Sequence, residues 1–128
     1  MCIGAVVLLA LTPTLRRTYE RLTTAPAHDV VQQFLFAAAA GDSGAISALS
    51  AEPAVLSRAL AVHENDSVAL EVMAQSLRFS RGRTIGDTII ADYAHDAAVC
   101  PGGEITDIQF QLVRQADQWR VRYFGGIC

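Results

Sequence analysis

The stretch Gln118-Trp119-Arg120-Val121-Arg122-Tyr123-Phe124-Gly125 (QWRVRYFG), close to the terminal Cys128, alternates apolar and charged side chains. Residues 87–99 and 107–112 alternate with the same period of two. This period is typical of strands with one buried and one solvated face. The last forty-odd residues therefore predict three strands of a curved antiparallel sheet, which a helical first half must cover.

The alternation also predicts which side chains face the helices. The expected inward residues are Ile89, Ala91, Tyr93, His95, Ala97, Val99, Ile108, Phe110, Leu112, Trp119, Val121 and Tyr123. The expected outward residues include Asp92, Asp96, Gln109, Gln111, Arg120, Arg122 and Phe124. Neighbouring strands bring opposite charges together on one face, so we expect Arg120 and Arg122 to meet Asp92 and Asp96 there.

A further strand is predicted from about residue 75, where Leu77 and Phe79 alternate with polar neighbours and Gly82 suggests a turn. The sheet then has about four strands. Three arginines surround this first hairpin, at Arg78, Arg81 and Arg83. They indicate either a solvated hairpin that protects an edge strand or an anion site.

The first half of the chain shows helical spacing. Val31, Phe34 and Ala38 predict a helix over 26–40 that begins at Pro26, with Gly41 as its left-handed C-cap. Three more helices are predicted. They begin at Asp42 or Ser43, at Pro53 and at Asp66. The fold class is therefore α+β, with N-terminal helices packed in the hollow of a curved antiparallel sheet.

Composition favours one domain, over 26–128. The chain has 128 residues, 52% of them hydrophobic and 18% charged, which is typical of a folded domain. The net charge is -3, without an extended basic run, so nucleic acid is excluded as the default partner because such binding rests on neutralised phosphates.

Residues 1–25 are interpreted as an apolar segment followed by a polar linker or short amphipathic helix. Residues 2–11 are continuously apolar but far shorter than the roughly 20 residues that span a bilayer. They suit a signal or anchor remnant, with residues 1–12 as a membrane tether and a cell-envelope or secreted location, or else an apolar helix packed on the domain. Arg16 and Arg17, on the C-terminal side of this run, suit an anchor whose following domain is cytoplasmic, which conflicts with export.

The three cysteines, Cys2, Cys100 and Cys128, form no CxxC or Cys/His pattern, so no metal is expected. No GxGxxG or Walker-type loop occurs either, and no cofactor is expected. Cys100 closes one predicted strand and Cys128 follows the last, at the same end of the sheet. A bridge between them would close a loop of about 28 residues and stabilise the fold by roughly 3 to 4 kcal/mol. The alternative is two unrelated buried thiols.

Two local patterns resemble the nuclear-transport-factor-two-like superfamily. Phe34-Leu35-x-Ala37-Ala38-x-x-Gly41-Asp42-x-x-Ala45-Ile46-x-x-Leu49 looks like its first helix, Gly-Asp turn and second helix. Asp117-x-Trp119-Arg120-Val121 resembles its last strand. The resemblance implies the cone-shaped fold of ketosteroid isomerases and polyketide cyclases, with the mouth of the cone as a ligand site. Residues 53–73 depart from the family in being mostly helical.

The inward aromatic and imidazole groups are the candidate pocket: Tyr93, His95, Trp119, Tyr123, Phe34 and Phe110. We expect a non-catalytic domain that binds a small apolar or amphipathic molecule or pairs with another protein through its sheet. One such pairing is a homodimer. The alternative is a small isomerase, dehydratase or cyclase with His95 as base, Tyr93 as donor and Asp87 as a further acid-base group. Asp92, Asp96 and Asp107 have outward parity, which favours the non-catalytic interpretation.

The bridge between Cys100 and Cys128 has a direct test. Titration of free thiols in denaturant should find one free thiol per chain, that of Cys2, if the bridge forms in an oxidising compartment. Three free thiols in protein recovered without reductant from such a compartment would exclude it.

Overall fold

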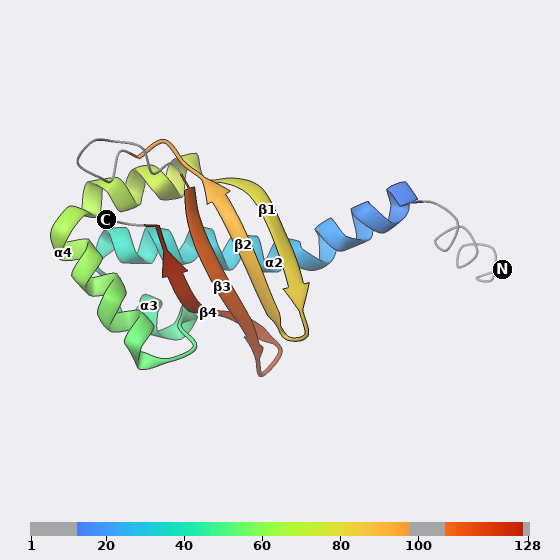
Figure 1. The fold of residues 1–128 in the computed structure, drawn as a ribbon. Helices are drawn as coiled ribbons and strands as arrows, with labels where there is room; N and C mark the ends of the chain where they lie inside the picture. Colours follow the sequence, from blue (N-terminus) through green and yellow to red (C-terminus); the bar gives the residue numbers. More distant parts are fainter. Residues whose placement is uncertain (1–12, 98–106, 127–128) are drawn as a thin grey trace.

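The computed structural model describes residues 13–97 and 107–126, with side chains from residue 26 onward. Within these residues three helices precede four strands (Figure 1). The helices are α2 (Pro13–Ala40), α3 (Ser43–Leu49) and α4 (Pro53–Ser76). The strands are β1 (Arg78–Ile85), β2 (Thr88–Ala94), β3 (Asp107–Gln115) and β4 (Gln118–Gly125).

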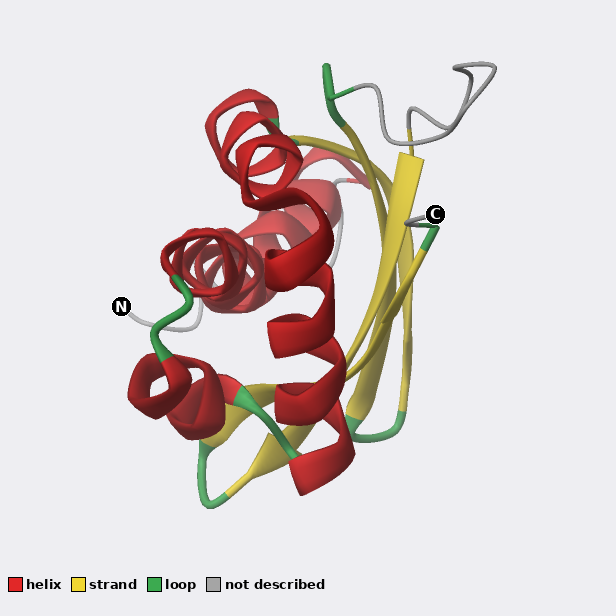
Figure 2. Cartoon of the chain, turned by 90° about the vertical axis from the view of Figure 1, so that its left-hand side faces the viewer, coloured by secondary structure: helices red, strands yellow, loops and turns green. Residues whose placement is uncertain are grey.

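The strands form one antiparallel sheet in the order β1-β2-β3-β4. The sheet is curved and does not close on itself, and the helices lie together on one of its faces (Figure 2). The predicted α+β class, with N-terminal helices covering a curved sheet, is confirmed. The opposite face of the sheet carries no helix from the described part of the chain.

The first predicted helix begins earlier than expected. It starts at Pro13, and Pro26 lies inside it rather than at its first turn. A proline in a helix removes one backbone hydrogen bond. Pro26 is exposed, where water can bind the carbonyl group that is left without a partner, so the helix continues through it.

The end of α2 follows the prediction. Gly41 adopts a φ of 66°, and its N–H donates to Ala38 O at 3.1 Å while the Asp42 N–H donates to Ala37 O at 3.0 Å. These two bonds are the Schellman pattern that satisfies the last helical carbonyls. The carboxylate of Asp42 then accepts from the Ala45 N–H at 3.1 Å and caps α3.

The third and fourth predicted helices are the two parts of α4. They meet at a kink at Asp66, whose φ of -160° and ψ of 79° are not helical. The Asp66 carboxylate accepts from the Ala69 N–H at 3.0 Å, as an N-cap residue does. Asp66 thus ends one helix and starts the next, as predicted.

The first hairpin turns later than predicted. Gly82 lies within β1 opposite Ala91, and the turn is formed by Gly86 and Asp87. Gly86 has a φ of 58°, a positive value at the first of two turn residues, which is the pattern of a type II′ turn. The second hairpin has positive φ at both Ala116 and Asp117, the type I′ pattern.

A bulge in β4 changes the predicted orientation of two side chains. Leu112 pairs with Val121 but Gln111 pairs with Tyr123, so Arg122 is an extra residue and the inward alternation shifts by one. Tyr123 therefore faces outward and is 41% exposed, while Phe124 faces the helices and is 2% exposed. The prediction had these two reversed because strict alternation cannot anticipate a bulge.

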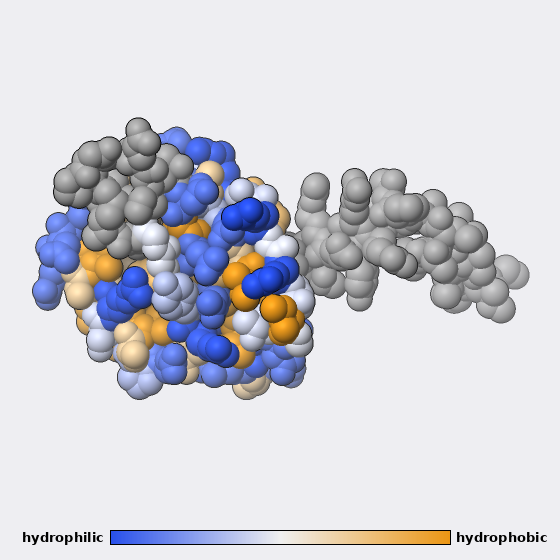
Figure 3. Space-filling model, viewed as in Figure 1, coloured by the Kyte–Doolittle hydropathy of each residue, from blue (hydrophilic) through white to orange (hydrophobic). Residues whose placement is uncertain are grey.

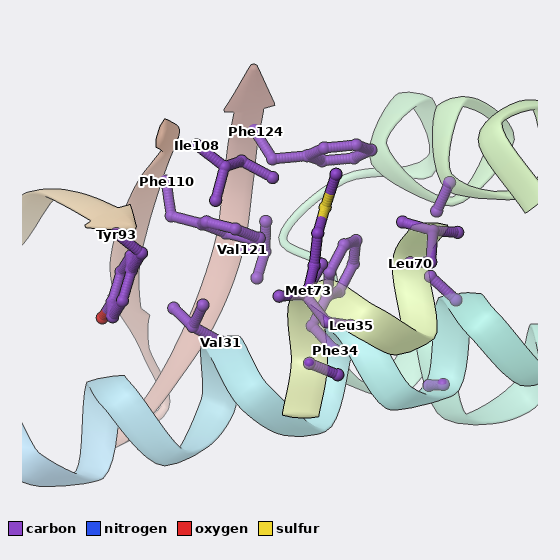
Figure 4. Packing of buried hydrophobic residues seen from close by; sticks show 14 of the residues in the cluster. Val31, Phe34, Leu35, Leu70, Met73, Tyr93, Ile108, Phe110, Val121 and Phe124 are labelled. Carbon is purple, nitrogen blue, oxygen red and sulfur yellow. The ribbon is translucent and has the colours of Figure 1, made fainter. Parts of the chain in front are cut away.

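The core lies between α2, α4 and the sheet (Figure 4). The predicted inward residues of β2 and β3 are buried there. The Phe34 ring of α2 lies 5.8 Å from that of Phe110 and 5.3 Å from that of Phe124. Phe110 stacks with Phe124 at 6.0 Å and meets Tyr93 edge-on at 6.1 Å. Aromatic pairs in such arrangements stabilise the fold by more than the burial of their apolar area alone.

The outer face pairs charges differently from the prediction. Asp92 accepts from Arg81 Nε at 2.8 Å and from Gln109 at 3.1 Å, and Asp96 accepts from Arg78 at 2.9 Å. Arg120 and Arg122 are not the partners, because β3 separates β4 from β2. The remainder of this face is a mixture of hydrophilic and smaller hydrophobic areas (Figure 3).

The bulge predicts unequal effects of two neighbouring substitutions. Phe124→Ala should lower the free energy of unfolding by about 3 to 5 kcal/mol, because it removes a buried ring from the core. Tyr123→Ala should lower the free energy of unfolding by only about 1 kcal/mol, since the Tyr123 ring is partly solvated. Urea denaturation of both variants measures the difference. A larger loss of unfolding free energy for Tyr123→Ala than for Phe124→Ala would contradict the bulge and support strict alternation along β4.

Candidate functional site

The candidate site lies where α2 meets β1 and β2. We call it the corner cluster, and it consists of His28, Phe79 and Tyr93. His28 precedes the buried Val31 by one helical turn, so it lies on the side of α2 that faces the sheet. Phe79 and Tyr93 are opposite each other in the β1–β2 register and share the inner face.

The three rings contact one another. His28 Nδ1 lies 2.5 Å from the Tyr93 hydroxyl, a short hydrogen bond. The His28 ring is 4.5 Å from that of Phe79 and 5.7 Å from that of Tyr93 between centroids, and Phe79 is 5.8 Å from Tyr93. Tyr93 is buried, whereas Phe79 is 52% exposed. The cluster is thus a polar pair beneath a half-open aromatic ring.

Gly82 allows the Phe79 ring to lie along β1. A Cβ atom on Gly82 would come within 3.1 Å of Phe79 Cε2 and 3.2 Å of the Ile90 carbonyl oxygen, closer than ordinary contacts. The ring therefore occupies the space that a side chain at this position would fill. Together with Thr84, whose strand partner Ile89 is buried, Phe79 and Gly82 form the uncovered inner face of β1.

Burial fixes the protonation of the polar pair. Desolvation lowers the pKa of His28, although the nearby Asp29 charge opposes this, and desolvation raises the pKa of Tyr93. At neutral pH the Tyr93 hydroxyl therefore donates its proton to Nδ1 of a neutral His28. The remaining imidazole proton is then on Nε2. The pair can orient a hydrogen bond but does not hold a charge.

His95 lies on the same inner face as Tyr93, just beyond the end of β2. It is 1% exposed, and its Nδ1 accepts from the Ala97 N–H at 3.1 Å. Burial lowers its pKa, against the opposing charges of Asp107 and Asp96. Its Nε2 has no hydrogen-bond partner among the described residues, and Tyr93 pairs with His28 instead.

Asp87 does not join these groups. It lies in the turn before β2, at the opposite end of that strand from Tyr93, and its carbonyl oxygen accepts from the Arg114 N–H at 3.0 Å. Asp87 is thus not brought to His95 and Tyr93, which share one face at the other end of β2.

The other predicted pocket residues divide between core and surface. Phe34 and Phe110 pack in the core, and the Phe110 ring contacts that of Tyr93. Trp119 lies at the start of β4, partly buried against the core and opposite Arg114, whose guanidinium group is 5.8 Å from the indole. Tyr123 faces outward, with the Arg58 guanidinium 5.5 Å from its ring. Three of the six residues therefore meet: Phe34, Phe110 and Tyr93.

The sequence prediction missed His28 as the partner of Tyr93. A signal was present, because His28 precedes Val31 by three residues and Leu35 by seven, a spacing that places all three on one side of a helix. The predicted pocket included Phe34 of this helix but did not continue along the same side of the helix to His28.

Several predictions concern residues that the structure does not describe. The tether over 1–12 and the pair Cys100 and Cys128 lie outside the described residues. Within them, no group of three or more His, Cys, Asp or Glu side chains could hold a metal ion. None of the helices in the described part of the chain is both long and apolar enough to cross a membrane.

Comparisons of the chain with protein-family models, curated proteins and solved structures found no match. The function is therefore inferred from the geometry of the described residues.

The protonation of the half-buried His28 and the buried His95 predicts a pH dependence of stability. The folded chain holds His28 and His95 neutral at a pH where the unfolded chain binds protons, so stability is greatest above their ordinary pKa of 6.5. It should fall as the pH drops from 7.5 to 5.5. Urea denaturation at both values measures this loss.

The variants His28→Gln and His95→Gln should each reduce the loss, and the double variant should remove most of it. If the wild-type chain became more stable on acidification over this range, His28 and His95 could not both be neutral in the folded chain.

Proposed function

We propose that this chain is a non-catalytic binding domain of the cone-fold class, which binds another polypeptide by adding a strand to β1. The observation that carries this proposal is that all eight residues of β1 are exposed. Strand addition uses the unpaired backbone groups of a sheet edge for affinity and alternate side chains for specificity. The order of helices followed by a four-stranded sheet supports the resemblance to the nuclear-transport-factor-two-like superfamily.

The two edges of the sheet differ. The edge at β4 is partly covered, because Ser50 forms a parallel bridge with Val121 and the Ala51 N–H donates to the Val121 carbonyl at 2.7 Å. β1 pairs on one side with β2 and has no strand on its other side among the described residues. The edge available for an added strand is therefore that of β1.

The hydrogen-bond register identifies the free backbone groups. The Arg114 N–H donates to the Asp87 carbonyl, so Asp87, Ile89 and Ala91 point their backbone groups toward β3. Thr88, Ile90 and Asp92 then point theirs toward β1, where their partners are Ile85, Arg83 and Arg81. The intervening Gly82 and Thr84 consequently direct their N–H and C=O groups away from the sheet.

The packing of the interior supports a non-catalytic role. Aromatic side chains from α2 and the sheet contact one another in the hollow of the sheet, where the resemblance places a ligand. Asp87 lies at the opposite end of β2 from Tyr93 and His95, so no carboxylate of that predicted acid-base arrangement joins the other two groups. For the location we retain the expectation from the sequence, a tethered or exported domain with residues 1–12 as the tether.

The corner cluster supports a second candidate function, the binding of a small apolar or amphipathic molecule. The exposed Phe79 ring offers an apolar surface, and the His28–Tyr93 pair beneath it offers an oriented hydrogen-bonding group. A homodimer through the sheet is the remaining expectation for partners.

The variants Thr84→Pro and Thr84→Val test strand addition. Proline lacks the N–H but is tolerated where that group faces solvent, so Thr84→Pro should fold while losing one edge donor. Peptides selected on the wild-type chain from a random display library should bind Thr84→Pro at least about tenfold more weakly, and Thr84→Val nearly as well as wild type.

Fluorescence anisotropy measures these affinities, and circular dichroism with urea denaturation verifies that both variants fold. Equal binding to Thr84→Pro and Thr84→Val would exclude β1 as the docking edge.

A further inference from the structure

The exposed edge strand is strongly basic. β1 has the sequence RFSRGRTI, with arginines at 78, 81 and 83 and no acidic residue. Arg78 and Arg81 pair with Asp96 and Asp92, yet their side chains remain 56% and 84% exposed. Arg83 forms no ion pair with any described side chain. The edge thus keeps a positive charge in a chain whose net charge is -3.

The arginines flank the backbone groups that an added strand would use. Arg81 and Arg83 lie on either side of Gly82, and Arg83 also neighbours Thr84. Their side chains are on the outer face, opposite Asp92 and Ile90. A strand paired with Gly82 and Thr84 would place its own outer-face residues about 5 Å from these arginines, close enough for charge pairing.

From this register we propose that the partner is an extended acidic segment of another protein, with Asp or Glu at alternate positions on the outer face. The inference rests on the proposed strand addition and adds the chemistry of the partner. Carboxylates beside Arg81 and Arg83 form charge-assisted hydrogen bonds, whereas lysines or arginines there repel.

The inner face of β1 determines which residues of the added strand fit between its acidic positions. Phe79, Gly82 and Thr84 face inward and each is exposed. The Phe79 ring meets His28 of α2 but remains 52% exposed. An apolar side chain from the added strand can pack on the open half of the Phe79 ring. The bound segment therefore alternates acidic and apolar residues, with the acidic ones beside the arginines.

The same charges disfavour a second copy of this chain as the occupant. An antiparallel pair of β1 strands centred on Gly82 sets Arg81 opposite Arg83, and one centred on Arg83 sets Arg83 opposite itself. Like charges directly opposite each other destabilise a pair of strands. The bulge between Phe79 and Arg81 further disturbs pairing of the edge with itself.

Two synthetic peptides with the same alternating valines test the inference, one with Glu and one with Lys at the polar positions. The Glu peptide should bind the full chain at least about tenfold more tightly than the Lys peptide. Its affinity should fall between about 0.05 M and about 0.5 M NaCl, because salt screens exposed charges. Arg83→Gln should weaken binding of the Glu peptide, and Arg83→Glu should make the chain bind the Lys peptide more tightly than the Glu peptide.

Arg122→Glu is the matched control, since Arg122 is an exposed arginine on the outer face of β4, away from the β1 edge. It should leave the preference for the Glu peptide unchanged. If both peptides bind equally and Thr84→Pro weakens both, strand addition stands and the acidic preference is overturned.

If neither peptide binds, or Thr84→Pro binds both as well as Thr84→Val does, strand addition itself is overturned. Sedimentation that shows a dimer of the wild-type chain, lost in Thr84→Pro, would identify a second copy as the occupant and overturn the inference.

Discussion

The packing of α2 across the concave face of the sheet is the contact on which the rest of the structure depends. Phe34 reaches two strands at once, since its ring touches those of Phe110 on β3 and Phe124 on β4. Helix and sheet each have one apolar side, and neither is stable until those sides are buried against each other. The line of α2 over the sheet also brings His28 to Tyr93.

The helices and the segment after α3 cover the β4 side of the sheet and leave the β1 side exposed. Phe124 joins the core because the bulge at Arg122 turns it inward, and the segment after α3 bonds to the edge of β4. The β1 end receives no such cover: its eight residues are exposed, and its inner face meets α2 mainly through Phe79 and His28. The helices thus pack toward β3 and β4, and this packing both forms the core there and leaves the β1 edge open.

The elements whose signals are local were predictable. Gly41, Asp42 and Asp66 end or begin helices through bonds to their own neighbours, and the inward residues of β2 and β3 follow a period of two. The errors concern choices between local alternatives. Gly82 and Gly86 both suit a hairpin turn, and the cross-strand register selects Gly86. Pro26 suits a first turn but is also tolerated on an exposed side of a longer helix.

The sequence by itself determined the class of fold, the capping of the helices and the inward position of Tyr93, because these follow from spacing along the chain. Only the tertiary structure decided that Tyr123 and Phe124 exchange faces, that His28 is the partner of Tyr93, and that Asp92 pairs with Arg81 rather than with an arginine of β4. These contacts join residues far apart in sequence, so they depend on strand order, on a bulge and on the path of a helix. For the same reason QWRVRYFG predicted a strand but not which of its aromatic rings reaches the core.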